Sequence, residues 1–141
     1  KLYRALLVSN LLAIHQKKYI GKLSAFCGAV SAGYACGAAI TYMLGGNFNQ
    51  IANTIINTLA NTSGIICDGA KPSCAAKISS ALDAALLAHT MSMHDDVFHA
   101  DEGIVKDDLE KTIRAVGYIG REGMKSTDIE VLNIMIDKVC P

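Results

Sequence analysis

The chain has 141 residues, of which 51% are apolar and only 6% aromatic, and it contains no tryptophan. This length suffices for one domain with its own core, and abundant alanine and glycine with only two prolines favour closely packed helices over a sandwich or barrel. The formal net charge is zero and the basic residues form no stripe, which argues against a nucleic-acid or anionic-membrane partner.

The N-terminal part of the chain predicts two helices. Residues 2–15 carry an apolar stripe that widens to nearly the whole circumference of a helix. Residues 22–44 are predicted to form a buried central helix. Gly28, Gly33 and Gly37 recur there at helical spacing, and such small residues let neighbouring helices approach closely.

A long uncharged stretch also raises the hypothesis of a membrane span. No Asp, Glu, Lys or Arg occurs from Leu23 to Cys67, and an apolar run of about 20 residues can cross a bilayer. The run is built from Ala, Gly, Ser and Cys rather than Leu, Ile and Phe, so insertion is only weakly favoured. We therefore expect this helix to be buried in protein, with no membrane partner.

The remainder of the chain predicts four more helices. Their expected ranges are 48–61, Pro72 to about Thr90, 106–124, and a last helix that a Thr127–Glu130 capping box opens and that runs through Ile136. The polar face of 48–61 consists of Asn and Gln, which predicts that a second surface covers it, either a missing half of a longer protein or a second copy. The expected fold is all-α: a compact bundle of about six helices around the central Gly/Ala-rich helix, forming a single domain over 1–141.

The stretch GIICDGAKPSCAAK, residues 64–77, places Cys67 and Cys74 on either side of a tight turn. Cys74 falls in the first turn of a helix, where unpaired N–H groups and the helix dipole stabilise a thiolate, and Lys71 and Lys77 add positive charge. The pair could form a disulfide, a metal or cluster site, a nucleophile with its partner, or two small core residues.

Composition and spacing narrow these four roles only in part. Five cysteines without a secretory leader predict a reducing, cytoplasmic environment, which disfavours the disulfide. Cys-x6-Cys is not a zinc-knuckle or ferredoxin spacing, so it does not single out a metal. A metal or cluster site, a nucleophile and simple core packing all stay open at this point.

The other candidate ligands are less well placed by their spacing. Cys27 and Cys36 are nine residues apart, which puts them on nearly opposite sides of a helix, so at most one can join the loop cysteines. Cys140, near the C-terminus, is expected to be incidental. His89, His94 and His99 lie among acidic residues, but a spacing of five does not stack side chains on one helical face. A solvated loop rather than a metal site is expected there, and the role of the three histidines stays open.

Four stretches together resemble the iron–sulfur-dependent L-serine dehydratase alpha-chain and L-cysteine desulfidase family. The glycine-rich segment 19–46, with a cysteine shortly after Leu-Ser-Ala, is similar to the family's glycine-rich helix. Residues 64–77 resemble its paired-cysteine loop, which is the most specific match. Residues 101–124 and 126–136 resemble its C-terminal helices, so the likeness covers nearly the whole chain.

The resemblance implies a site and a reaction. Cys27, Cys67 and Cys74 would each hold one iron of a [4Fe–4S] cluster and leave the fourth iron open for substrate. The implied reaction is β-elimination from L-serine or L-cysteine to pyruvate, ammonia and water or sulfide. Lys71 and Lys77, by their charge and position, are candidates for holding the carboxylate of the small L-amino-acid substrate.

The resemblance also implies a longer protein. The family's N-terminal half is absent from this chain, and with it the motif expected to supply the catalytic base. The chain is therefore expected to be the C-terminal, ligand-bearing part of a longer enzyme, to be inactive alone, and to partner the missing half, with a homo-oligomer also possible. The competing hypothesis is a non-catalytic helical metal-binding or structural module.

Overall fold

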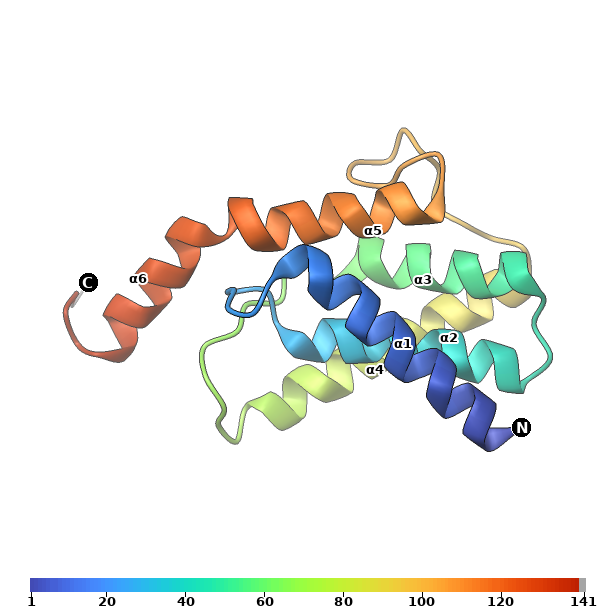
Figure 1. Ribbon diagram of the computed structural model, residues 1–141, viewed down its shortest axis with the longest axis horizontal. Coiled ribbons are helices and arrows are strands. Elements are labelled where there is room, and N and C mark those ends of the chain that lie inside the picture. Colours follow the sequence, from blue (N-terminus) through green and yellow to red (C-terminus); the bar gives the residue numbers. More distant parts are fainter. Residues whose placement is uncertain (140–141) are drawn as a thin grey trace.

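Helices account for nearly all regular structure in residues 1–139, which are the residues that this computed structural model describes (Figure 1). No β-sheet forms among them, and a single antiparallel bridge joins Phe26 to Ile66. The predicted all-α fold of about six helices is thus confirmed. The elements are α1 (Leu2–Ile20), α2 (Gly28–Met43), α3 (Phe48–Thr62), α4 (Cys74–Met93), α5 (Leu109–Tyr118), the π-helical turn η1 (Ile119–Gly123) and α6 (Lys125–Met135).

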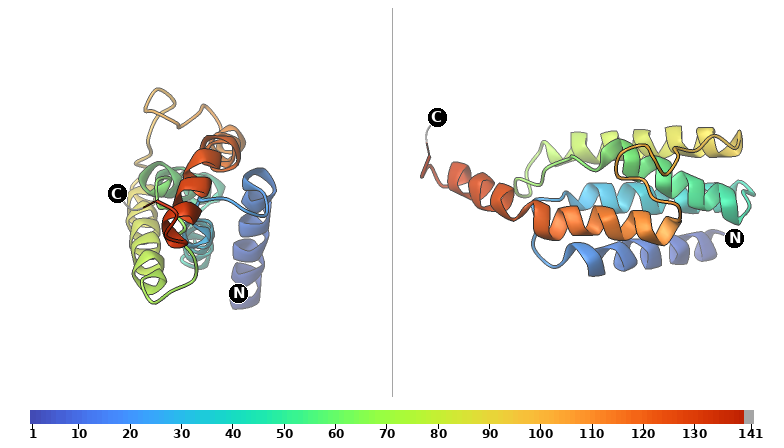
Figure 2. Two further views of the ribbon diagram at one scale, coloured as in Figure 1. Left: turned by 90° about the vertical axis from the view of Figure 1, so that its left-hand side faces the viewer. Right: turned by 90° about the horizontal axis from the view of Figure 1, so that it is seen from above.

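The small-residue helix α2 occupies the centre of the bundle, as predicted. It packs against α1, α3 and α4, and Figure 2 shows it between α1 and α4. A Cβ on Gly33 would lie 2.8 Å from the carbonyl oxygen of Ala81, and one on Gly37 would lie 2.9 Å from the Cβ of Ala85. The glycines therefore set the close approach of α2 and α4.

The beginning of α2 differs from the prediction. The helix begins at Gly28 rather than residue 22, because Gly21, at φ 95°, ends α1 and residues 25–27 pair in extended form with residues 65–67. Cys27 is therefore the N-cap of α2 and lies outside the helix proper.

Three other helix starts also differ. Helix α5 begins at Leu109 rather than residue 106, with Asp108 as its N-cap. Helix α4 begins at Cys74 with Ser73 as its N-cap, two residues later than expected, and extends to Met93. The Thr127–Glu130 capping box does not form, because Thr127 lies inside α6. The chain runs from η1 directly into α6. Met124 O accepts the N–H of Asp128 at 2.8 Å, so the Asp128 N–H needs no side-chain cap.

The uncharged polar face of α3 is covered partly by the chain itself. Asn57 is 1% exposed, and its side-chain amide donates to Asp96 O at 2.9 Å and accepts the Phe98 N–H at 3.0 Å. Residues 96–98 thus satisfy the side chain that a second surface was expected to cover. No helix within residues 1–139 has the combination of length and apolar character that a bilayer crossing requires.

Glu110 of α5 ties α5 to α1. Its carboxylate accepts hydrogen bonds from the Tyr19 hydroxyl at 2.6 Å, from His15 Nε2 at 2.8 Å and from Arg114 Nε at 3.0 Å. The Tyr19 hydroxyl first, with His15 and Arg114, lowers the pKa of Glu110 to about 2. A lowered carboxyl pKa stabilises the fold above its unfolded value of about 4.3, and this stabilisation is lost as the pH falls towards 2.

We expect Glu110→Gln to lower the free energy of unfolding at pH 7 by about 1 kcal/mol, discounted because the carboxylate is partly exposed. The variant should also show less loss of stability between about pH 4 and 2 than the unmodified chain. Urea unfolding at pH 7 and pH 3 measures both effects. Glu130→Gln is the matched control, since Glu130 makes no ion pair within residues 1–139. Equal effects from both variants would contradict the role of Glu110.

Candidate metal centre

The bridge between two loops brings Cys27 and Cys67 to the same place. The Cys27 N–H donates to Ile65 O at 3.0 Å, and the Cys67 N–H donates to Ala25 O at 2.6 Å. Both cysteines are one residue from the bridged pair, Phe26 and Ile66. Because side chains alternate along extended backbone, the two thiols project to the same side of the bridge.

Cys74 returns to this site through the turn that follows Cys67. Gly69 has φ +86°, a conformation that side chains other than glycine rarely adopt, and it reverses the chain. The Cys74 thiol donates to Gly69 O at 3.3 Å, and the Cys74 N–H donates to Lys71 O at 2.9 Å. Cys74 is the first residue of α4, as predicted, but the N–H groups there are not left unpaired, because those of Cys74 and Ala75 already donate to Lys71 O and Pro72 O.

Cys27, Cys67 and Cys74 all line one pocket of about 390 Å³. Cys27 is buried and the other two cysteines are partly exposed. Gly28, Ala29 and Ala32 of α2 form much of the remaining wall, and a Cβ on Gly28 would meet no atom within 4 Å. Small side chains on α2 therefore leave room between the cysteines.

Asp68 holds the two candidate lysines beside the pocket. Lys71 and Lys77 both form ion pairs with its carboxylate, and Lys77 Nζ also donates to Ile66 O at 2.7 Å. Hydrogen bonds from Lys71 and then Lys77 lower the pKa of Asp68, and the hydrogen bond to Asp68 raises the pKa of Lys77. Lys77 also lines the cysteine pocket. Lys77 belongs to α4, so its contacts join that helix to Ile66 and Asp68, the two residues that flank Cys67.

Three features of the site had only weak signals in the sequence. The bridge is the first of them. The second is Ser24, whose hydroxyl donates to Gly120 O at 2.5 Å and accepts the Phe26 N–H at 2.9 Å, linking η1 to the cysteine-bearing loop. The third is α6, whose Met135 side chain lies within 3.0 Å of the position of a Cβ on Gly69. The Leu-Ser-Ala stretch before the first cysteine was the one available hint.

The remaining predicted ligands lie elsewhere. Cys36 does not line the cysteine pocket, in agreement with its expected opposite orientation. His89 Nδ1 is 2.9 Å from the Thr41 hydroxyl, joining α4 to α2, whereas His94 ends α4 and His99 lies in the loop that follows. Cys140 falls outside the described residues. Within residues 1–139, no three His, Cys, Asp or Glu side chains converge as a single metal ion requires.

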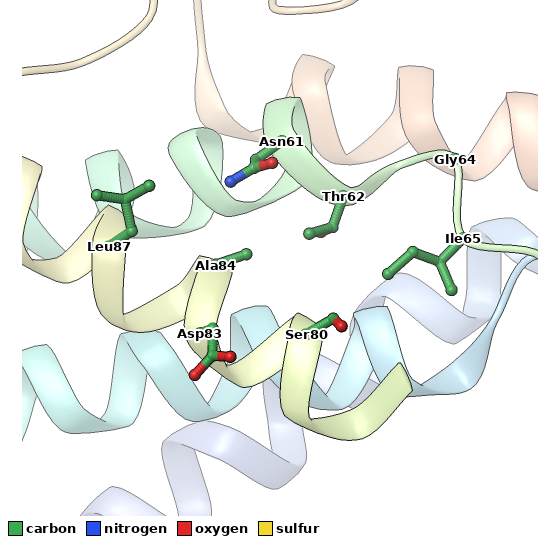
Figure 3. Close-up of a pocket in the computed structure, with 8 residues that line it drawn as sticks. All are labelled: Asn61, Thr62, Gly64, Ile65, Ser80, Asp83, Ala84 and Leu87. Carbon is green, nitrogen blue, oxygen red and sulfur yellow. The ribbon is translucent and has the colours of Figure 1, made fainter. Parts of the chain in front are cut away.

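A larger pocket, of about 540 Å³, lies between the end of α3 and α4. Figure 3 shows Asn61 and Thr62 on α3 facing a wall of α4 residues, with Asp83 directed away from Asn61. Of its polar side chains, Asn61, Ser80 and Asp83 are exposed and Thr62 is buried, and no cysteine lines it. We therefore place the candidate site at the cysteine pocket.

The fold and the site together define an all-helical domain that presents three cysteine thiols to one pocket. A family model described as the serine dehydratase alpha chain matches residues 1–133, and the chain belongs to this family. Relatives called UPF0597 protein are 60% identical in Treponema denticola, 55% in Finegoldia magna and 46% in Parabacteroides distasonis, each over 96–99% of this chain. The chain spans about a third of the length of these relatives. No solved structure matches it.

Proposed function

We propose that this chain supplies Cys27, Cys67 and Cys74 as the protein ligands of a [4Fe–4S] cluster in an amino-acid lyase. The reaction is β-elimination from L-serine or L-cysteine, giving pyruvate, ammonia and water or sulfide. The proposal joins the chain's membership of the serine dehydratase alpha-chain family to one observation, the three thiols around one pocket.

The donor set suits such a group. Thiolates are the usual ligands of iron–sulfur clusters, and a four-iron cluster distributes its ligands around itself rather than at one point. Three cysteines that line one pocket are a donor set that could hold three of the four irons of such a cluster. All four described cysteines are free, in keeping with a reducing compartment, which we propose to be the cytoplasm.

With three thiolate ligands, such a cluster supplies one open iron that can act as a Lewis acid on the substrate. The residues of this chain would position the substrate beside it. Lys77 already has two acceptors, Asp68 and Ile66 O, whereas in the described part of the chain Lys71 has only Asp68 and its side chain is 45% exposed. Lys71 is therefore the better placed of the two to turn towards a substrate carboxylate, while Lys77 holds the loop.

The base that removes the α-proton is proposed to lie in the part of the longer protein that this chain does not include. The chain covers only about a third of its relatives, so most of the substrate pocket is also expected there. On this proposal the 141 residues hold the ligands but do not turn over substrate by themselves.

Anaerobic reconstitution with iron and sulfide tests the proposal. Iron and sulfide are counted per chain, and visible absorbance is recorded before and after exposure to air. About four irons per chain with a broad visible band would support the cluster. Stoichiometric zinc binding without iron uptake would instead favour the non-catalytic metal-binding module. If neither metal binds, even in the full-length protein, the site is not a metal centre.

For the lysines, we expect Lys71→Met in the full-length enzyme to raise KM by roughly 10-fold with a smaller effect on kcat, because it removes one charged contact to the substrate. Lys77→Met should instead lower cluster retention, since it releases the cysteine loop. Steady-state kinetics and iron content separate the two effects. An unchanged KM in Lys71→Met would remove this lysine from the substrate site.

A further inference from the structure

Helix α1 has a second apolar face that nothing in the described chain covers. Its inner face, with Ala5 and Ile20 buried, packs on the bundle. The opposite stripe is here called the outer face of α1. It consists of Tyr3, Leu7, Leu11 and Ile14, whose exposed fractions lie between 57% and 82%.

The spacing of this stripe is that of a buried helical face. Steps of four, four and three residues place the side chains in one row along the helix. Leu6, which is 50% exposed and lies three residues after Tyr3, widens the row. A contiguous patch of large apolar side chains marks an interaction surface rather than an ordinary solvated one.

We propose that the outer face of α1 docks against the other part of the full-length protein, onto an apolar surface with an acidic rim. The length of the relatives supports this docking. The chain accounts for only 32–33% of its relatives in Treponema denticola, Finegoldia magna and Parabacteroides distasonis. The remaining two-thirds of such a chain needs a contact surface on this domain.

The charge of α1 favours an acidic partner over a second copy of the chain. Helix α1 carries Arg4, Lys17 and Lys18, and no Asp or Glu occurs anywhere before Asp68. In a symmetric pair of α1 helices, an antiparallel arrangement would set Arg4 of one copy near Lys17 and Lys18 of the other. A parallel arrangement would set each basic residue near its own counterpart. Like charges at a contact oppose association, so the stripe suits an acidic partner better than a second copy of itself.

Hydroxyl-radical footprinting tests this docking, because it reports the exposure of individual side chains. The comparison is between the 141-residue chain and a full-length chimera in which it replaces the matching third of the Treponema denticola relative. We expect oxidation of Tyr3, Leu7, Leu11 and Ile14 to fall at least roughly fivefold in the chimera, as these side chains leave solvent. Leu87 on α4, also exposed, serves as the internal reference. Equal oxidation of the stripe in both proteins would overturn the proposal.

If the chimera does not fold, footprinting is repeated on the full-length Treponema denticola relative and on the segment of it that matches this chain, with the same expected result.

Light scattering of the 141-residue chain provides the second measurement, and we expect a monomer. A dimer that Leu7→Ser with Leu11→Ser abolishes, but Leu86→Ser with Leu87→Ser does not, would assign the face to a second copy. Binding to anionic phospholipid vesicles that the first pair abolishes would assign it to a membrane surface. Both results contradict the proposal. Neither readout involves iron, so the docking can fail or hold independently of the cluster.

Discussion

Replacing Cys74 by serine is expected to abolish stable cluster binding while leaving the helical content unchanged. Serine preserves the size of the side chain at the start of α4, and its hydroxyl can still donate to Gly69 O as the thiol does. A hydroxyl is nevertheless a poor substitute for a thiolate as an iron–sulfur ligand. We expect iron to fall from about four per chain to less than about one, measured after anaerobic reconstitution, with circular dichroism as the folding check.

Cys36→Ser is the matched control, because Cys36 belongs to α2 but does not line the cysteine pocket. This variant should retain iron at the level of the unmodified chain. Cys27→Ser and Cys67→Ser should behave like Cys74→Ser, since all three residues line the same pocket. Full reconstitution of Cys74→Ser, or loss of iron in Cys36→Ser, would show that the ligand assignment is wrong.

The second large effect is expected at Gly33, where a single methyl group should destabilise the bundle. A Cβ on Gly33 would lie 2.8 Å from Ala81 O, 2.9 Å from its Cβ and 3.0 Å from its carbonyl carbon. Two of these are backbone atoms, so α2 and α4 must move apart. Alanine gains about 1 kcal/mol of helix propensity over glycine. Overpacking, however, costs about 1–3 kcal/mol, because the side chains at the α2–α4 contact must shift. We expect a net loss of up to about 2 kcal/mol in urea unfolding.

Gly28→Ala provides the comparison within the same helix. A Cβ there meets no atom within 4 Å, so only the gain in helix propensity should remain. We expect this variant to be as stable as the unmodified chain or more stable. If Gly33→Ala were equally stable, the two helices would be farther apart than the structure places them.

The core of the fold was predictable because its signals are local. Glycines at helical spacing predicted a close helix contact, and Gly33 and Gly37 do meet Ala81 and Ala85. No local signal of this kind predicted the backbone partner of Cys67, which is Ala25 in a distant loop. The extended pairing of residues 25–27 with residues 65–67 depends on two loops that are remote in the sequence, and neither has a strand-like pattern of its own.

The same distinction explains the errors around the site. The Thr127–Glu130 pattern met the local rule for a capping box, but the helix begins at Lys125, directly after the π-helical turn, so Thr127 lies inside α6 and not at its N-cap. Lys71 and Lys77 were recognised as positive charge near a thiolate. Their shared attachment to Asp68 depends on how the turn folds back on α4, which residue types alone do not determine.

The bridge between Phe26 and Ile66 has a consequence for the order of assembly. The whole α2–α3 hairpin separates the two sides of the bridge, so Cys27 and Cys67 meet only after that hairpin has closed. The entropy of closing this long loop is then already lost on folding, before any metal arrives. Loading is therefore expected as a late event on a folded chain, and removing iron by a chelator should empty the site without unfolding the helices around it.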